Sequence, residues 1–196
     1  MEKNFATIIL ASGFSERMGE PKALLKWDET TTFLEKIINE YTKAGCTRII
    51  CMINHITEPL CRDLKIPSNV TFVINEHPEW GRFYSLRLAS MAAKERDFCF
   101  IQNVDNPFVT VEVIEKLYAQ RNPDAWCSPV YEQKGGHPVL LPQVVIEKIA
   151  QIKENDFTLR DILKHYQKIE VEIDTETILR NINTPEEYSS YFENQS

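Results

Sequence analysis

Two basic side chains and several small residues come together directly after the first apolar run of the sequence. Residues 10–25 read LASGFSERMGEPKALL and hold Arg17 and Lys22 among alanine, serine and glycine. Small side chains leave backbone N–H groups uncovered, and we expect Gly13 and Gly19 to take positive φ values where the chain wraps a ligand. Uncovered amides, a planar guanidinium and a point-charge ammonium are the donors that a polyphosphate requires. The segment therefore predicts a triphosphate-binding loop.

The spacing of this loop differs from that of two common phosphate-binding motifs. A Walker A loop places lysine directly after its second glycine, but Glu20 and Pro21 precede Lys22. A dinucleotide fingerprint needs glycines at its first, third and sixth positions, and the residues after Gly13 do not supply them. A surface loop whose arginine and lysine are merely solvated is the alternative interpretation.

A single carboxylate follows a second apolar run. Residues 98–104 read FCFIQNV, and Asp105 comes next, directly before Asn106 and Pro107. A carboxylate at the end of a buried strand is costly unless it has a partner. Mg²⁺ is such a partner, because it binds carboxylate and phosphate oxygens together. Asp105 is therefore a candidate magnesium ligand, with a purely structural turn before the proline as the alternative.

These candidate residues need a scaffold in which strands and helices alternate. Strands are predicted at residues 5–10, 48–53, 70–74, 98–104 and 125–131, with a further strand at the end of 134–141. Helices are predicted after the N-caps Thr32, Thr110 and Thr184, at 57–64 and 155–163, and from Ser85 onward. Such alternation predicts an α/β fold, a three-layer α/β/α Rossmann-like arrangement with a mostly parallel twisted sheet. Ligands bind such sheets at the carboxyl ends of the strands, where both the loop and Asp105 are expected.

Length and composition limit the classes of protein to consider. The 196 residues suit one domain spanning 1–196, and 43% of them are hydrophobic. A formal net charge of −7 argues against nucleic acid as a partner, so the basic residues of the loop indicate a local site. No apolar run reaches the length of a membrane span, and the first residues do not resemble a signal peptide. Five scattered cysteines indicate reduced thiols in a cytoplasmic protein.

The first apolar run and the loop after it follow the pattern of a known family. The pattern is a strand followed by A-x-G, x-S-x-R-M-G and P-K-x-L-L. The chain resembles the MobA-like nucleotidyltransferases, and is most similar to the branch that attaches CMP to molybdopterin. The resemblance implies the nucleotidyltransferase type of fold, with Asp105 holding Mg²⁺. We assign Arg17 to the β- and γ-phosphates of an NTP and Lys22 to its α-phosphate. Nucleotide contacts are further implied for Leu10, Ala11, Ser12, Gly13, Ser15, Asn75, Gly81 and Ser85.

Later segments share this resemblance and depart from it in places. Residues 135–141, GGHPVLL, resemble an acceptor-side stretch of the cytidylyl branch, which implies that His137 binds or orients the acceptor phosphate and that its charge matters near neutral pH. A strand-end histidine is the alternative. Asn181 and Asn183 stand where the pattern has aspartates, so Asn183 is expected to give an uncharged metal contact unless a water does so. Arg82 replaces a Met-like residue.

Together, the residues and the resemblance predict transfer of a nucleotide. An acceptor phosphate attacks the α-phosphorus of an NTP in line and releases pyrophosphate, so the protein must supply positioning and charge neutralisation. Ser12 stands at the base-contacting position and is nearer in bulk to the alanine of cytidylyl transfer than to the glycine of guanylyl transfer, which favours CTP. The expected acceptor is molybdopterin or another phosphorylated small molecule. Contact with a molybdoenzyme chaperone is also expected.

Several alternatives stay open at this point. A nucleotidyltransferase with this loop and acid could act on a sugar phosphate or an alcohol phosphate. A non-catalytic nucleotide-binding accessory protein of molybdoenzyme maturation would be marked by Asn181 and Asn183. Arg160, in the segment 155–163, is expected either to meet the acceptor or to be a solvated helix arginine.

Overall fold

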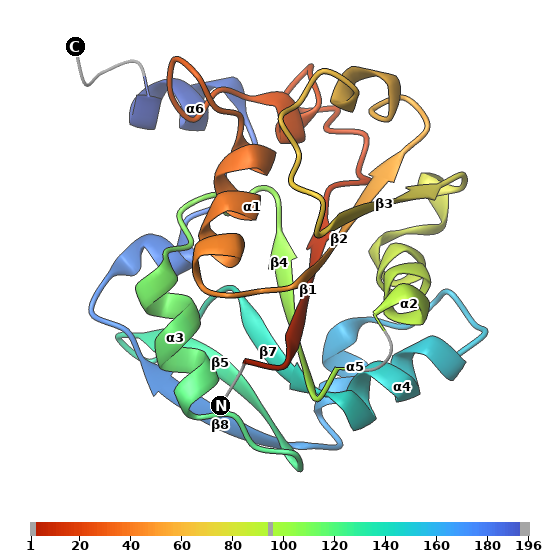
Figure 1. Cartoon of the computed structure of the whole chain (residues 1–196), viewed down its shortest axis with the longest axis vertical. Coiled ribbons are helices and arrows are strands. Elements are labelled where there is room, and N and C mark those ends of the chain that lie inside the picture. Colours follow the sequence, from red (N-terminus) through yellow and green to blue (C-terminus); the bar gives the residue numbers. More distant parts are fainter. Residues whose placement is uncertain (1–2, 94–95, 193–196) are drawn as a thin grey trace.

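The computed structural model describes residues 3–93 and 96–192, which form an eight-stranded sheet with helices on both faces (Figure 1). The strands are β1 (Phe5–Leu10), β2 (Arg48–Asn54), β3 (Val70–Asn75), β4 (Phe98–Asn103), β5 (Ala125–Tyr131), β6 (Lys134–Gly135), β7 (Val139–Pro142) and β8 (Gln167–Glu172). The α-helices are α1 (Phe33–Lys43), α2 (Arg82–Ala92), α3 (Val111–Ala119), α4 (Gln143–Gln151), α5 (Leu159–Leu163) and α6 (Pro185–Phe192). Four 3₁₀ turns are η1 (Lys22–Leu24), η2 (Pro59–Cys61), η3 (Pro78–Trp80) and η4 (Glu176–Leu179).

The centre of the sheet is parallel. Strands run in the order β3-β2-β1-β4-β7-β5-β6, and β8 pairs with β5. β1 pairs in parallel with β2 on one side and with β4 on the other, so that Leu10 lies beside Met52 and Asn103. The direction in which the chain adds strands therefore reverses at β1. In open α/β sheets, this reversal point at the carboxyl edge is where ligands bind.

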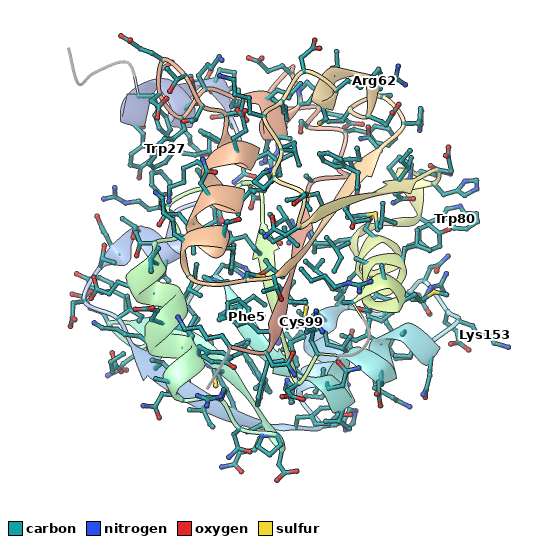
Figure 2. All side chains as sticks on the ribbon, viewed as in Figure 1. Phe5, Trp27, Arg62, Trp80, Cys99 and Lys153 are labelled. Atoms are coloured by element: carbon teal, nitrogen blue, oxygen red, sulfur yellow. The ribbon has the colours of Figure 1, made fainter. Side chains whose placement is uncertain are left out.

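Two apolar clusters occupy the opposite faces of the sheet. Alternation along β1 sends Phe5 and Ile9 to the face covered by α1 and α3, and Ala6 and Ile8 to the face covered by α2, α4 and α5. Figure 1 shows these two groups of helices on either side of the strands. In Figure 2, the labelled side chains of Phe5 and Cys99 lie inside the molecule, whereas Arg62 and Lys153 project from its edge. The predicted three-layer α/β/α fold is confirmed.

The second half of the chain adds a mixed extension to the parallel centre. β7 is antiparallel to both β4 and β5, and β8 is parallel to β5. The connection that enters β7 contains His137, which is joined to Pro138 by a cis peptide bond. Because β7 is antiparallel to β4, with Val139 opposite Ile101, the segment before β7 lies alongside the carboxyl end of β4. The extension thereby supplies a second wall next to the reversal point.

An aromatic cluster attaches the last helix to the first half of the chain. Phe192 of α6 packs with ring centroids 5.4 Å from both Trp27 and Phe33, and Tyr188 lies 6.0 Å from Phe33. The Tyr188 hydroxyl also donates to the backbone carbonyl oxygen of Lys26 at 2.9 Å. Figure 2 shows Trp27 beside α6. The start of α6 is thus held close to the loop that follows β1.

Most predicted elements form, and their caps agree with the sequence. Thr32 and Glu35 make the expected capping box at α1, and Thr110 caps α3. The helix expected at 57–64 is reduced to the single turn η2. The helix expected from Ser85 begins at Arg82, directly after Gly81 with φ of 89°. Among the described residues, no helix combines the length and apolar character needed to cross a bilayer.

Candidate active site

The loop after β1 is held in shape by its own backbone. The carbonyl oxygen of Ser15 accepts hydrogen bonds from the N–H groups of Met18 and Gly19 at 2.9 and 3.1 Å, and its hydroxyl accepts one from the N–H of Lys22 at 3.3 Å. Positive φ values occur at Ser15 (56°) and Gly19 (81°). The positive φ expected at Gly13 is wrong, because the turn is made at Ser15. Gly13 instead leaves open space, since a Cβ there would meet no atom within 4 Å.

The predicted cations, acid and amide lie together at the carboxyl edge of the sheet. The ammonium of Lys22 is 3.9 Å from Oδ2 of Asp105 and donates to Oδ1 of Asn183 at 2.7 Å. Arg17 reaches the same Asn183 oxygen at 3.5 Å. A third cation was not assigned from the sequence: Arg82 lies 3.9 Å from Oδ2 of Asp105. Residues far apart in the chain therefore form one cluster, in which Lys22 and Arg82 flank the carboxylate and Arg17 joins through Asn183.

Burial shapes the charge of this cluster. The side chains of Lys22 and Asp105 are only 13% and 15% exposed. Burial lowers the pKa of Lys22, and the nearby Asp105 carboxylate partly opposes that effect. The other oxygen of Asp105, Oδ1, is buried and has no hydrogen-bond partner in the described part of the chain. An unpaired carboxylate oxygen of this kind is a suitable ligand for a hard cation.

The donor set fits magnesium that is held mainly by phosphates and water. Among the described residues, no three His, Cys, Asp or Glu side chains converge on one metal position. Asp105 and the amide oxygen of Asn183, which both contact Lys22, are the protein oxygens at hand. Mg²⁺ typically takes one or two carboxylates and completes its shell with water and substrate phosphates.

Asn183 is positioned by hydrogen bonds on both sides. The N–H of Ile182 donates to the carbonyl oxygen of Asp105 at 2.7 Å, which ties this segment to the end of β4. The N–H of Asn183 donates to Glu187 at 2.6 Å, and the N–H of Glu187 donates to the Thr184 hydroxyl at 3.3 Å, completing the expected cap of α6. The amide of Asn183 is therefore fixed toward Lys22 by local capping and by one long-range bond.

Three polar residues form a buried network behind the loop. The N–H of His77 donates to Oδ1 of Asn75 at 2.8 Å, which fixes the orientation of that amide. Nδ2 of Asn75 then donates to the Ser85 hydroxyl at 2.9 Å, and Ser85 shares a 2.7 Å hydrogen bond with the Ser12 hydroxyl. Two hydroxyl protons serve one mutual bond, so one proton is left over. The pair Ser12 and Ser85 can therefore offer one donor to a ligand.

A small cavity of about 160 Å³ lies over this network and the cation cluster. The predicted residues that line it are Leu10, Ala11, Ser12, Gly13, Ser15, Lys22, Gly81, Ser85 and Asp105. Asn75 lies behind Ser85, Asn183 contacts Lys22 from outside the cavity, and Arg17 contacts Asn183. The sequence interpretation missed Pro78, Arg82, Asn103 and Val104 as lining residues. Asn103 had a visible signal, a polar residue ending an apolar run.

A second, much larger cavity of about 1100 Å³ adjoins the first. Its walls carry the aromatic side chains of Trp126, Phe157 and Tyr166, and its lining includes His137 and Arg160. The indole Nε1 of Trp126 is buried without a hydrogen-bond partner among the described residues. Arg160 lines this cavity with an exposed side chain, which agrees with both interpretations given for it. The predicted acceptor residue His137 lines only this large cavity, which Leu10 and Gly81 alone among the predicted nucleotide residues also reach.

His137 lines the large cavity and contacts Asn103, which lines both cavities. Its Nε2 lies 3.1 Å from Nδ2 of Asn103, and with the amide as donor the neutral ring carries its proton on Nδ1. Burial lowers the pKa of His137, the Asp105 carboxylate opposes this, and Arg82 adds to it. Desolvation thus works against the charge that the sequence interpretation expected on His137 near neutral pH.

Comparisons with known proteins agree with this geometry. Residues 7–170 match the model of the MobA-like NTP transferase domain. The chain is 29% identical over 181 residues to the molybdenum cofactor cytidylyltransferase of Escherichia coli, covering 92% of each chain. It is 28% identical over 199 residues to a probable molybdenum cofactor guanylyltransferase of Bacillus cytotoxicus, covering 95% of this chain and 96% of that one. A nucleotidyl transferase from Methanothermobacter shares the fold, with a TM-score of 0.79, 18% identity, and 97% and 96% coverage.

Proposed function

The chain belongs to the MobA-like NTP transferase family, and from that premise we propose that it transfers CMP from CTP to the phosphate of a molybdopterin-type acceptor, releasing pyrophosphate. Nucleotidyl transfer itself is the activity of the family. The nucleotide and the acceptor are our proposal, because the curated relatives include both cytidylyl- and guanylyltransferases of the molybdenum cofactor.

One observation carries the proposal: the loop cation and the strand-end acid meet. Lys22 and Asp105 are 83 positions apart in the sequence, yet their charged atoms are 3.9 Å apart. Asn183 joins the same cluster through its hydrogen bond to Lys22. A triphosphate placed in the small cavity would meet the loop amides, Lys22 and Asp105 at once.

The obstacle to this reaction is charge. Two anionic phosphates must approach each other, and negative charge grows on the departing pyrophosphate. We assign Lys22 to the α-phosphate, where it neutralises the reacting centre, and Arg17 to the β- and γ-phosphates that leave. Asp105 and Asn183 would hold Mg²⁺, which when bound supplies further neutralisation of phosphate oxygens. Fixed donors of this kind act without reorganising during the reaction, which is the main source of their effect.

The choice of CTP is supported by the residue that meets the base. Ser12 projects its hydroxyl to Ser85 and is buried, so its bulk narrows the cavity as the alanine of a cytidylyltransferase would. The spare hydroxyl proton of the pair suits a ligand acceptor such as the O2 or N3 of cytosine. Thermal-shift titration with CTP, GTP, UTP and ATP in the presence of Mg²⁺ tests this choice. We expect the largest stabilisation with CTP; a larger one with GTP would contradict the choice of base.

The acceptor assignment is supported by the large cavity. Its aromatic walls, Trp126, Phe157 and Tyr166, suit a flat fused ring, and its unpartnered indole N–H suits a ring acceptor atom. Incubation with CTP, Mg²⁺ and molybdopterin, with release of pyrophosphate as the readout, tests the assignment. Sugar phosphates and alcohol phosphates serve as competing acceptors, and faster turnover with one of them would replace molybdopterin.

A non-catalytic accessory role is the second candidate, and Asn183 favours it. A neutral amide at this position adds no charge to a metal site that has one nearby carboxylate, Asp105. Tight CTP binding without pyrophosphate release in the presence of any acceptor would support this role over transfer.

The five cysteines are free and buried, which supports our expectation of a reducing, cytoplasmic compartment.

A further inference from the structure

Arg82 lies where the two cavities meet. The small and the large cavity share the lining residues Leu10, Gly81, Arg82 and Asn103, and Arg82 is the one charged side chain in that described set. Its guanidinium is 3.9 Å from Asp105, and two-thirds of its side chain (66%) is exposed. The side chain is thus anchored at the junction while its donors are largely free to meet a ligand.

The positive charge of Arg82 affects titratable groups in both cavities. It lowers the pKa of Lys22 on the nucleotide side and the pKa of His137 on the acceptor side, in each case as one of several smaller contributions beside burial. Arg82 also begins α2, an eleven-residue helix whose N-cap, Gly81, has no side chain to occupy the free N–H groups. The helix terminus adds positive potential at the same place.

The acceptor cavity needs such a cation at its inner end. The attacking oxygen must come within about 3–3.5 Å of the α-phosphorus, so the acceptor phosphate has to lie at the junction. His137 lines only the large cavity, and burial lowers its pKa, which disfavours a positive charge on the ring. Arg160, Lys164 and Lys168 line the large cavity but not the small one. Arg82 is therefore the cation that can contact an acceptor phosphate while that phosphate faces the nucleotide.

We propose that Arg82 binds the phosphomonoester of the acceptor and aims its oxygen at the α-phosphorus, an inference that rests on the proposed transfer to a phosphorylated acceptor. The acceptor oxygen forms a bond to the α-phosphorus while the bond from that phosphorus to the bridging oxygen breaks. Pyrophosphate leaves with the electron pair. A phosphomonoester is largely dianionic at neutral pH, so no base is needed to remove a proton. A bidentate guanidinium is the group that orients such an anion.

The test compares Arg82→Met with Arg82→Lys and with the control Arg62→Met. Arg62 has the same side chain and a similar exposure of 70%, and it pairs only with Glu58 in the described ion pairs. For Arg82→Met we expect the KM for molybdopterin at saturating CTP, and its Kd by calorimetry, to rise about 10- to 100-fold. The Kd for CTP should stay within about twofold of the wild-type value, because Arg82 is assigned to the acceptor. Arg82→Lys should recover part of the loss, and Arg62→Met should behave as wild type.

Two outcomes would overturn the assignment of Arg82. In the first, the wild-type chain is active and Arg82→Met keeps the wild-type KM and Kd for molybdopterin. This result would contradict the role of Arg82 and leave the proposed function intact. A weakened Kd for CTP with unchanged acceptor binding shows that Arg82 serves the nucleotide instead. If the wild-type chain neither binds molybdopterin nor releases pyrophosphate with it, the proposed function fails and this assignment falls with it.

Discussion

The two cavities of this protein are built by different means. The small one, about 160 Å³, is enclosed by a loop whose backbone is internally hydrogen-bonded and by charged side chains that contact one another. The large one, about 1100 Å³, has aromatic and aliphatic side chains in its walls, together with charged ones such as Arg160 and Lys168. The first comes from the parallel centre of the fold, and the second from that centre together with the strands and helices added beside it.

The difference shows how recognition is divided between the two substrates. A triphosphate has the same charges whatever its base, so a rigid cradle of fixed donors suits it. An acceptor is distinguished mainly by the shape of its ring system, so a wide apolar cavity with a few polar atoms suits it. Substitutions on the nucleotide side should therefore affect rate and nucleotide affinity, whereas those on the acceptor side should affect packing and acceptor affinity.

The largest effect is expected at Lys22, on the nucleotide side. Lys22→Ala removes the ammonium that contacts Asp105 and Asn183, so we expect kcat/KM to fall by about 10²–10³. Steady-state pyrophosphate release measures the loss, and far-UV circular dichroism should show an intact fold. The matched control is Lys26→Ala at an exposed lysine of the same segment. Near-normal turnover in Lys22→Ala would contradict its role.

Gly136, on the acceptor side, should affect stability. A Cβ at Gly136 would overlap the backbone of Ile178, lying 2.8 Å from its carbonyl carbon and 2.9 Å from its Cβ. We expect Gly136→Ala to lower the free energy of unfolding by about 1–3 kcal/mol, measured by urea denaturation. Gly135→Ala is the control, because its Cβ would meet Ser128 at 3.4 Å, an ordinary contact. Equal stabilities of the two variants would show that the segment before His137 adjusts freely.

Gly13, on the nucleotide side, should behave in the opposite way. The Cβ of Gly13→Ala would meet no protein atom within 4 Å, and Gly13 does not need a positive φ, so stability should not change. The added methyl group would occupy the small cavity, and we expect the Kd for CTP to rise about tenfold. Thermal melts without ligand and CTP titration by calorimetry separate the two effects. An unchanged Kd would mean that the ligand does not approach this part of the loop.

The smallest effect is a pH dependence of stability at His137. Its pKa in the folded protein is lowered by burial below the ordinary value of 6.5. Above pH 6.5 the ring is neutral in both the folded and the unfolded chain. Below pH 6.5 the unfolded chain binds a proton more readily than the folded chain does. The free energy of unfolding therefore falls as the pH falls. Relative to His137→Gln, the wild-type chain should lose stability between pH 7 and pH 5.5 in urea denaturation. The exposed control His55→Gln should give a pH profile parallel to that of the wild-type chain. If the profile of His137→Gln were parallel as well, the lowered pKa of His137 would be contradicted.

Local patterns in the sequence accounted for much of the fold and part of the site. The apolar run of β1, the small-residue loop after it and the capping pair of Thr32 and Glu35 involve residues close together in the chain. Such features depend on backbone geometry over a few residues, which the local sequence specifies. The same reasoning overestimated the helix at 57–64 and placed a positive φ at Gly13 instead of Ser15.

The tertiary structure decided which residues meet and how much water reaches them. Nothing local to Arg82 or Asn103 indicates that both line the junction of two cavities, because that placement depends on how β4, α2 and the segment before β7 pack. The lowered pKa of His137 has the same origin, since it is governed by burial and by charges that are distant in the chain. Sequence by itself determined the residue types at the phosphate loop and at the strand-end acid. Only long-range packing determined the 2.7 Å contact between Lys22 and Asn183, because no short-range interaction joins residues 161 positions apart.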